Sequence, residues 1–150
     1  MWTFLFSKDL PDNQSPSAWF QHVLPRQREI YHHHSMRAQK VLTDLAFDQN
    51  LTCFASDNRG PVGLALVTGS DTDRRQLDLI AVRGDRRQIG LGSALLQNVI
   101  DRAREANIQT LIASGISSAN TPAVHLLSSL GFAGQRMGGV RMRCSLEEPV

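Results

Sequence analysis

The spacing of apolar residues changes along the chain, and the middle third has the pattern of strands. Three short apolar runs span Leu51–Ser56, Pro61–Thr68 and Gln76–Val82. Asp57–Gly60 supplies turn residues between the first two runs, and the polar segment Ser70–Arg75 separates the last two. Because short connections join antiparallel strands, the pattern predicts a three-stranded antiparallel meander.

From residue 90 onward the apolar spacing becomes helical. The predicted helix covers Gly90–Ala106, and its buried stripe recurs every four residues at Leu91, Leu95, Val99 and Ala103. A strand, Thr110–Ala113, follows this helix. The strand before it is Gln76–Val82, so a strand, a helix and a strand form one crossover with parallel strands.

The two ends of the chain add further elements. A helix is expected from Asn120 or Thr121 to Leu130, with Gly131 ending it, and a last strand over Val140–Leu146. The N-terminal third predicts a strand at Trp2–Phe6 followed by two helical stretches, from Pro16 or Ser17 to Pro25 and within Arg26–Gln49. The expected fold class is α+β: a mixed central sheet, antiparallel in its first half, with one parallel crossover and flanking helices. Residues 1–150 are expected to form a single domain.

Composition and charge exclude several classes of function. The net charge of +2 is too small to argue for nucleic acid. No apolar run approaches the roughly 20 residues of a membrane span, and the start lacks the features of a signal peptide, so a cytoplasmic location is expected. Cys53 and Cys144 are expected to be buried free thiols, and His32–His34 to be a solvated helix face, with no metal site.

The strongest chemical signal is a glycine-rich segment between a predicted strand and a predicted helix. Gly90 and Gly92 lack side chains where the first helical amides have no intrahelical partner, so a phosphate oxygen can approach the backbone closely. Arginines gather nearby in the sequence, at Arg74, Arg75, Arg83, Arg86 and Arg87. These features together predict a diphosphate site.

Two nucleotide sites are excluded by particular residues. A dinucleotide fingerprint needs a third glycine where Leu95 stands, and a turn directly after the strand, whereas Gly90 lies eight positions after Val82. A P-loop needs a lysine, and none lies nearby.

The segment instead fits R/Q-x-x-G-x-G/A, from Arg87 to Gly92, and so resembles the GNAT superfamily of N-acetyltransferases. Asn120–Ala123 and the Gly-Phe pair at Gly131 are similar to further landmarks of that family. The resemblance covers roughly residues 51–146 and implies acetyl-CoA as co-substrate. It implies that the CoA is bound by backbone or side-chain groups of Ile80, Ala81, Val82, Arg87, Gln88, Ile89, Gly90, Leu91, Gly92, Ser93 and Asn120. It also implies that the strands on either side of the crossover part to leave a slot; Asn120 could equally be a helix N-cap.

The catalytic residues are less well defined. Asp78 is the candidate base, and it would share a face with Ile80 and Val82 if strand alternation holds; a half-solvated surface charge is the alternative. Family members often carry a tyrosine as general acid five residues before the Gly-Phe phenylalanine, and here that position is Leu127. The resemblance implies an acyltransferase that acetylates a primary amine of a small molecule or protein. The alternative is a CoA-binding regulatory or structural domain with little turnover. The expected partners are acetyl-CoA and an amine acceptor. No nucleic acid or membrane partner is expected, and the chain could form a homodimer.

Overall fold

The computed structural model describes residues 3–10, 15–16, 18–19, 40–41, 43, 46–58, 60–69, 71–82, 90–116, 121–136 and 140–145. Seven described strands form one sheet in the order β1-β2-β3-β4-β5-β7-β6. Their bounds are β1 Thr3–Phe6, β2 Cys53–Asp57, β3 Gly60–Thr68, β4 Arg74–Val82, β5 Thr110–Ile116, β6 Ala133–Arg136 and β7 Val140–Ser145. A short 3-10 helix, η1, covers Ser7–Asp9, and the longer helices are α3, Leu91–Glu105, and α4, Thr121–Ser129.

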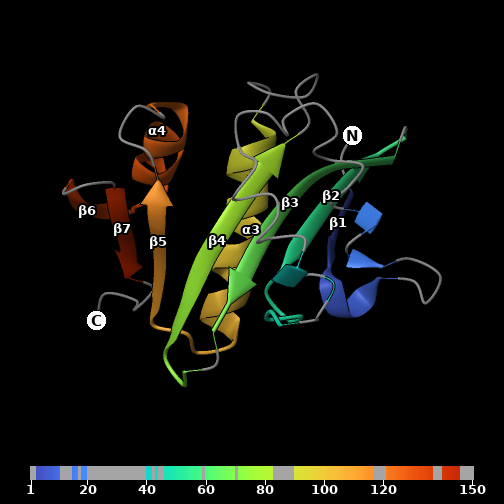
Figure 1. Ribbon diagram of the computed structural model, residues 1–150, viewed down its shortest axis with the longest axis horizontal. Helices are drawn as coiled ribbons and strands as arrows, with labels where there is room; N and C mark the ends of the chain where they lie inside the picture. The colour runs from blue at the N-terminus through green and yellow to red at the C-terminus, as the bar shows by residue number, and fades with distance from the viewer. Residues whose placement is uncertain are drawn as a thin grey trace.

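The sheet is mixed, as the sequence predicts. Strands β1 to β4 pair antiparallel with their chain neighbours, and β4 pairs parallel with β5. Figure 1 shows α3 crossing behind β3 and β4 on its way between the two parallel strands. The meander and the crossover are therefore confirmed. The α+β architecture follows from short turns in the first half and a helical connection in the second.

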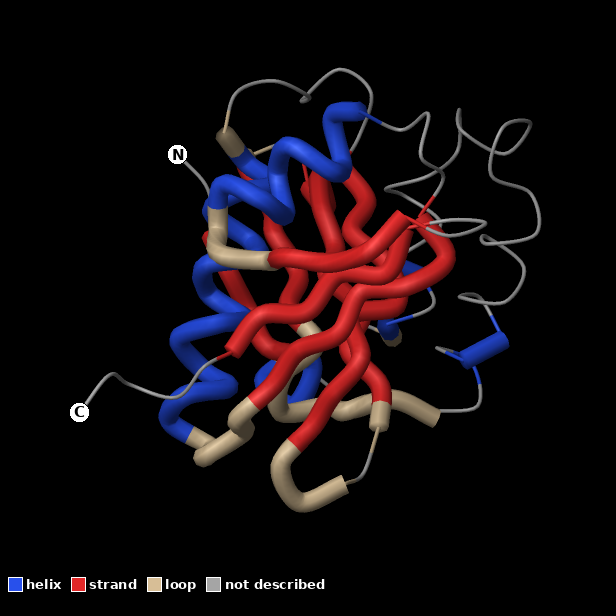
Figure 2. Tube along the Cα trace, turned by 90° about the vertical axis from the view of Figure 1, so that its left-hand side faces the viewer, coloured by secondary structure: helices blue, strands red, loops and turns tan. Residues whose placement is uncertain are grey.

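An apolar layer lies on each face of the sheet, whose strands are red in Figure 2. On one face α3 packs on β2, β3 and β4 through the stripe that its sequence predicts, with Leu95 and Val99 fully buried. On the other face Trp19 meets Phe54 edge-on, with ring centroids 5.4 Å apart. The two helices predicted before residue 50 fall largely outside the described residues, although Trp19 and Val41 are helical.

Several boundaries differ from the sequence prediction: β2 begins at Cys53 rather than Leu51, and β5 continues to Ile116 rather than ending at Ala113. Strand β4 starts at Arg74, inside the expected turn, because Arg74 and Arg75 pair with the first residues of β5. Strand β6 was not predicted, since Ala133–Arg136 carries little β-propensity and becomes a strand by pairing with β7. Strand β7 enters the sheet between β5 and β6, which no local pattern specifies.

The end of α4 is formed as predicted. Gly131 has φ +95°, and the amides of Gly131 and Phe132 donate to the carbonyl groups of Ser128 and Leu127. A side chain at this φ would be strained, so glycine ends the helix and turns the chain toward β6.

Candidate functional site

The two parallel strands separate before they end. The pairing of β4 with β5 runs from Arg74–Thr110 to Leu77–Ala113 and stops there, although β4 continues to Val82 and β5 to Ile116. In Figure 1 the two strands diverge toward their C-terminal ends. The edge of β4 at Ile80 and Ala81 is therefore not occupied by β5, and an extended ligand could bond there as an added strand does.

The N-terminus of α3 lies just beyond this opening. Gly90 precedes the helix with φ +82°, and its carbonyl accepts the first helical hydrogen bond, from the amide of Ala94 at 3.0 Å. In the part of the chain that the structure describes, no side chain caps this end, and the first turn has no acidic residue. The amides of Leu91, Gly92 and Ser93 thus carry the positive end of the helix dipole, which suits a phosphate.

The geometry of the two glycines fits a close ligand. A Cβ built on Gly90 would meet no described atom within 4 Å, so no described residue obstructs the approach to this backbone. A Cβ on Gly92 would lie 3.3 Å from Leu126 Cδ2 and 4.0 Å from Val82 Cγ2. The first turn of α3 is therefore held between the end of β4 and α4, with its amide end open.

The described residues of the predicted CoA site come together here. Ile80, Ala81 and Val82 end β4, Gly90 precedes α3, and Leu91, Gly92 and Ser93 form its first turn. Arg87, Gln88, Ile89 and Asn120 lie outside the described residues.

The arginines that lie close together in the sequence are not all at the end of β4 that adjoins α3. Arg74 and Arg75 start β4, at the end opposite Val82, and nine strand residues span roughly 27 Å at 3.3 Å per residue. Arg75 forms an ion pair with Asp48, with 2.8 Å between Nε and Oδ2. These two arginines therefore do not belong to the diphosphate site, and Arg83, Arg86 and Arg87 lie outside the described residues.

The expected orientation of Asp78 is wrong, because strand alternation breaks at that residue. Leu66 pairs with Leu79 while Val67 pairs with Leu77, so Asp78 is an extra residue in β4, a β-bulge. The Thr68 hydroxyl donates to Asp78 Oδ2 at 3.0 Å. Thr68 follows Val67, which belongs to the layer under α3, so Thr68 lies on the opposite face. Asp78 thus faces away from α3, whereas Ile80 and Val82 pack toward it.

Among the described side chains of α4, none is placed as a general acid. Leu127 is buried in the layer under α3, and its carbonyl accepts the amide of Phe132 at 3.0 Å. His125 is exposed, and the Ser129 hydroxyl donates to the Leu126 carbonyl at 2.7 Å. The position that carries tyrosine in many relatives is therefore a packing position in this chain.

Both cysteines are buried free thiols, as predicted. Burial raises the pKa of Cys53 from 9.0 to about 12, and desolvation also raises the pKa of Cys144, with Arg104 opposing it. Neither thiol is a nucleophile at neutral pH. Among the described residues no group of three or more His, Cys, Asp or Glu could hold a metal, and His32–His34 lie outside them.

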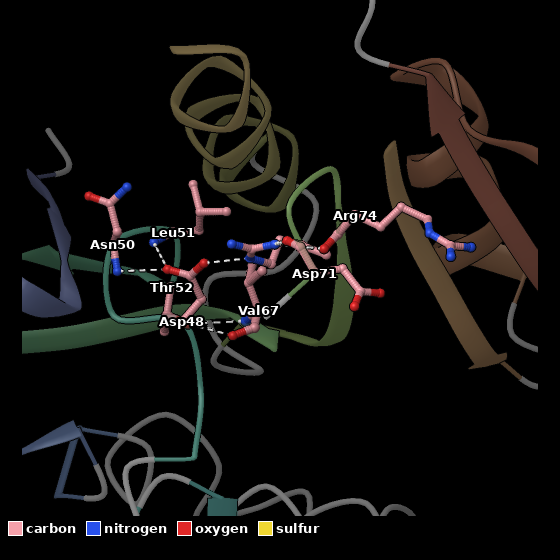
Figure 3. Close-up of polar contacts among 8 residues, drawn as sticks. Asp48, Asn50, Leu51, Thr52, Val67, Asp71 and Arg74 are labelled. Carbon is pink, nitrogen blue, oxygen red and sulfur yellow. Dashed lines mark hydrogen bonds and ion pairs between the residues drawn. The ribbon is translucent and has the colours of Figure 1, made fainter. Parts of the chain in front are cut away.

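Sequence reasoning missed a polar cluster at the opposite end of β4 (Figure 3). The Asp48 carboxylate accepts the backbone amides of Asn50 and Leu51 at 2.9 and 3.0 Å, in addition to the Arg75 side chain. Thr52 exchanges hydrogen bonds with the backbone of Val67, through its hydroxyl. The Asp-x-Asn spacing after an apolar helical stretch is a turn signal that could have indicated part of this cluster.

The fold and the site define a class of protein. Parting parallel strands beside a glycine-flanked helix N-terminus, which no described side chain caps, suit an extended ligand that ends in a diphosphate, such as an acyl-CoA. The family model of the acetyltransferase (GNAT) family matches residues 16–132, so the chain belongs to that family, with acetyl-CoA as its co-substrate.

Solved structures agree on the fold. The ribosomal-protein-S18-alanine N-acetyltransferase from Escherichia coli has 21% identity and a TM-score of 0.77, covering 100% of this chain and 97% of that one. A putative acetyltransferase from Salmonella typhimurium, solved with its cofactor acetyl-CoA, has 19% identity, coverage of 100% and 96%, and a TM-score of 0.66. A GNAT family acetyltransferase from Elizabethkingia anophelis with acetyl-CoA bound has 14% identity, coverage of 96% and 97%, and a TM-score of 0.68.

Two searches returned negative findings. A sequence search among curated proteins gives no match. Within the described residues, no helix has the length and apolar character that crossing a membrane requires.

Proposed function

We propose that the protein transfers an acetyl group from acetyl-CoA to a primary amine of a small molecule or a protein. The observation that carries this proposal is the opening between β4 and β5 beside the N-terminus of α3. It offers an extended slot for a pantetheine arm and, at its end, backbone amides for a pyrophosphate.

Two parts of the chain would bind CoA: the backbone at the end of β4, and the glycine-containing segment that leads into α3. The β4 backbone at Ile80, Ala81 and Val82 would bond the pantetheine arm. The amides of Leu91, Gly92 and Ser93 would bond the pyrophosphate, together with Arg87, Gln88, Ile89 and Gly90, and Asn120 would contact the pantetheine. The approach to Gly90, which no described residue obstructs, supports this placement, because a Cβ there would occupy the side from which a phosphate approaches.

Acetyl transfer requires a neutral amine and a donor to the thioester oxygen. The amide of Ala81 or Val82 is the proposed donor, since β4 ends at the opening. Asp78 is the proposed base, acting directly or through a water on the ammonium proton. Its place on the face away from α3 supports a route in which the amine and the CoA reach the reacting carbon from different faces of the sheet.

The leaving thiolate has no proposed protein acid. Leu127 cannot donate a proton, and the intrinsic pKa of a thiol, near 8.5, makes the thiolate a tolerable leaving group without one. The same residue supports the second candidate, a CoA-binding domain with little turnover, because general acid catalysis contributes about a hundredfold or more in rate.

The acceptor is tested by a panel of amines. Structural neighbours include an alanine N-acetyltransferase of a ribosomal protein and a nourseothricin acetyltransferase, so peptide N-termini and antibiotic amines belong in it with lysine peptides and polyamines. The protein is mixed with acetyl-CoA and each amine, and free thiol release is followed against a control without amine. Release with one class, and mass spectrometry of the acetylated amine, supports the proposal. Tight CoA binding with no release for any class would favour the binding domain.

A further inference from the structure

Gly63 of β3 lies directly beneath Leu95 of α3. A Cβ added to Gly63 would lie 2.7 Å from Leu95 Cδ1 and 3.4 Å from the Ala81 carbonyl oxygen. Real Cβ atoms essentially never approach another heavy atom within 3.0 Å. The φ of Gly63 is not among the positive values, so the backbone itself would accept an ordinary residue. A side chain at Gly63 would therefore force Leu95 Cδ1, the end of the leucine side chain, to move.

The same contact is linked to the predicted pyrophosphate site. Gly63 pairs with Val82, the last residue of β4, and the Val82 side chain lies next to Gly92 in the first turn of α3. Leu95 is one helical turn beyond Leu91 and is fully buried. Since a close-packed interior leaves a buried leucine little room for another rotamer, an added methyl group would move the helix as well as the side chain.

We propose that Gly63 is a positioning residue for CoA: by letting Leu95 rest on the sheet, it sets the height of the first turn of α3 above the end of β4. This inference rests on the proposed binding of the pyrophosphate by that turn. Hydrogen bonds weaken steeply as distance and angle depart from ideal, so a displacement of several tenths of an ångström weakens several amide contacts together. Glycine ordinarily weakens a strand interior, and the closeness of the helix offsets that cost.

The test combines one disturbing and one compensating substitution. Gly63→Ala is expected to weaken CoA binding about tenfold by isothermal titration calorimetry. Leu95→Val, which removes the Cδ1 atom that the new methyl group would meet, is expected to bind CoA within about twofold of the unaltered protein. The double variant is expected to recover to within about threefold, because the overlap is gone.

A matched control separates positioning from general loss of stability. Val99→Ala truncates a fully buried residue of the same stripe, one turn farther from the site. Urea unfolding should show that it lowers stability at least as much as Gly63→Ala, while its CoA affinity stays within about twofold. Gly63→Ala binding CoA like the unaltered protein, or a double variant without recovery, would overturn the inference.

Two further outcomes have a defined meaning. If Gly63→Ala fails to fold, Leu95→Met presses on Gly63 from the helix side with no change in β3, and a loss of about threefold in CoA affinity is expected. Unchanged affinity of this variant contradicts the inference. If the unaltered protein itself does not bind CoA, the proposed function fails, and that result differs from every outcome above.

Discussion

A single extra residue in β4 decides where the candidate base points. Without the bulge, Asp78 would lie under α3 with Ile80 and Val82, in an apolar layer where a carboxylate is costly to bury. The bulge places it instead beside Thr68, on the face that carries Trp19 and Leu79, where Asp78 itself is partly exposed. This partial exposure is compatible with proton transfer through a water.

Replacing Asp78 by asparagine tests this role. With an acceptor identified by the amine panel, Asp78→Asn is expected to lower kcat/KM about a hundredfold near pH 7, because an amide cannot take the ammonium proton. The deficit should shrink as pH rises toward the pKa of the amine, since the neutral amine then no longer needs a base. The affinity for CoA, measured by calorimetry, should not change.

Thr68→Val is the matched control for Asp78. It removes the hydroxyl that donates to the carboxylate but keeps the carboxylate itself, so a smaller loss, about threefold to tenfold, is expected. An Asp78→Asn variant that matches the unaltered enzyme at every pH would remove Asp78 from the mechanism.

Burial of Cys53 makes stability depend on pH in the alkaline range. The folded state keeps the proton up to about pH 12, whereas the unfolded thiol loses it near 9.0. The folded state therefore binds more protons in that window, and the free energy of unfolding falls as pH rises through it. Below pH 9.0 the Cys53 thiol is protonated in both states, so its contribution to the free energy of unfolding is fully present.

Urea unfolding at several pH values above neutrality measures this dependence. Cys53→Ala is expected to be less stable at neutral pH but to lose less of its stability as the solution becomes alkaline. Equal alkaline slopes for the two proteins would show that Cys53 is not responsible. A thiol reagent should leave the folded protein nearly unlabelled at neutral pH, which also keeps the background of the amine panel low.

At the scale of elements, β4 pairs with β5 at its N-terminal end and separates from it at its C-terminal end. Its first residues pair with β5 and with Asp48, whose segment also contacts η1 and α3: Gln49 accepts the amide of Lys8, and Asn50 accepts a side-chain hydrogen bond from Arg102 at 2.9 Å. Arg102 lies over the Phe6 ring at 5.0 Å. The last residues of β4 diverge from β5 and form the opening.

Asp48→Ala is therefore expected to lower stability without affecting the site. The carboxylate is only 13% exposed, and its loss leaves two backbone amides and Arg75 without this acceptor. The expected loss is about 2–4 kcal/mol in urea unfolding, and Asp48→Asn should lose less because an acceptor for the amides remains. CoA affinity should stay within about twofold, because the cluster lies at the far end of β4. A large loss of affinity in a folded Asp48→Ala protein would show that the two ends of β4 are coupled.

At the scale of the whole molecule, binding of CoA should stabilise the folded chain. A ligand at 100 times its dissociation constant adds about 2.7 kcal/mol. For a domain of this size each kcal/mol raises Tm by about 2–4 °C, so a rise of roughly 5–10 °C is expected in thermal unfolding. Pantetheine, which lacks the diphosphate, should give a much smaller shift at the same concentration. No Tm shift with CoA would contradict the proposed site at α3. Equal shifts with CoA and pantetheine would show that the diphosphate contributes little to the affinity.

Local patterns in the sequence predicted much of this molecule. The meander, α3 to within a residue of each end and the glycine that ends α4 all depend on contacts between near neighbours in the chain. Side-chain periodicity, turn residues and the missing Cβ of glycine act at that range, so they can be recognised without the fold. The identity of Leu127 likewise indicated from sequence that the usual acid is absent.

What only the tertiary structure decided depends on residues far apart in the chain. The face of Asp78 depends on the register between β3 and β4, and the place of β7 and the existence of β6 depend on strand pairing. Asp48 meets Arg75 across 27 positions, and Gly63 meets Leu95 through the packing of a helix on a sheet. A one-residue change in register moves a side chain to the other face, and helix height varies with single methyl groups. The sequence by itself therefore determined where a helix begins beside two glycines, as the proposed phosphate site requires, and the tertiary structure decided which side chains surround that helix end.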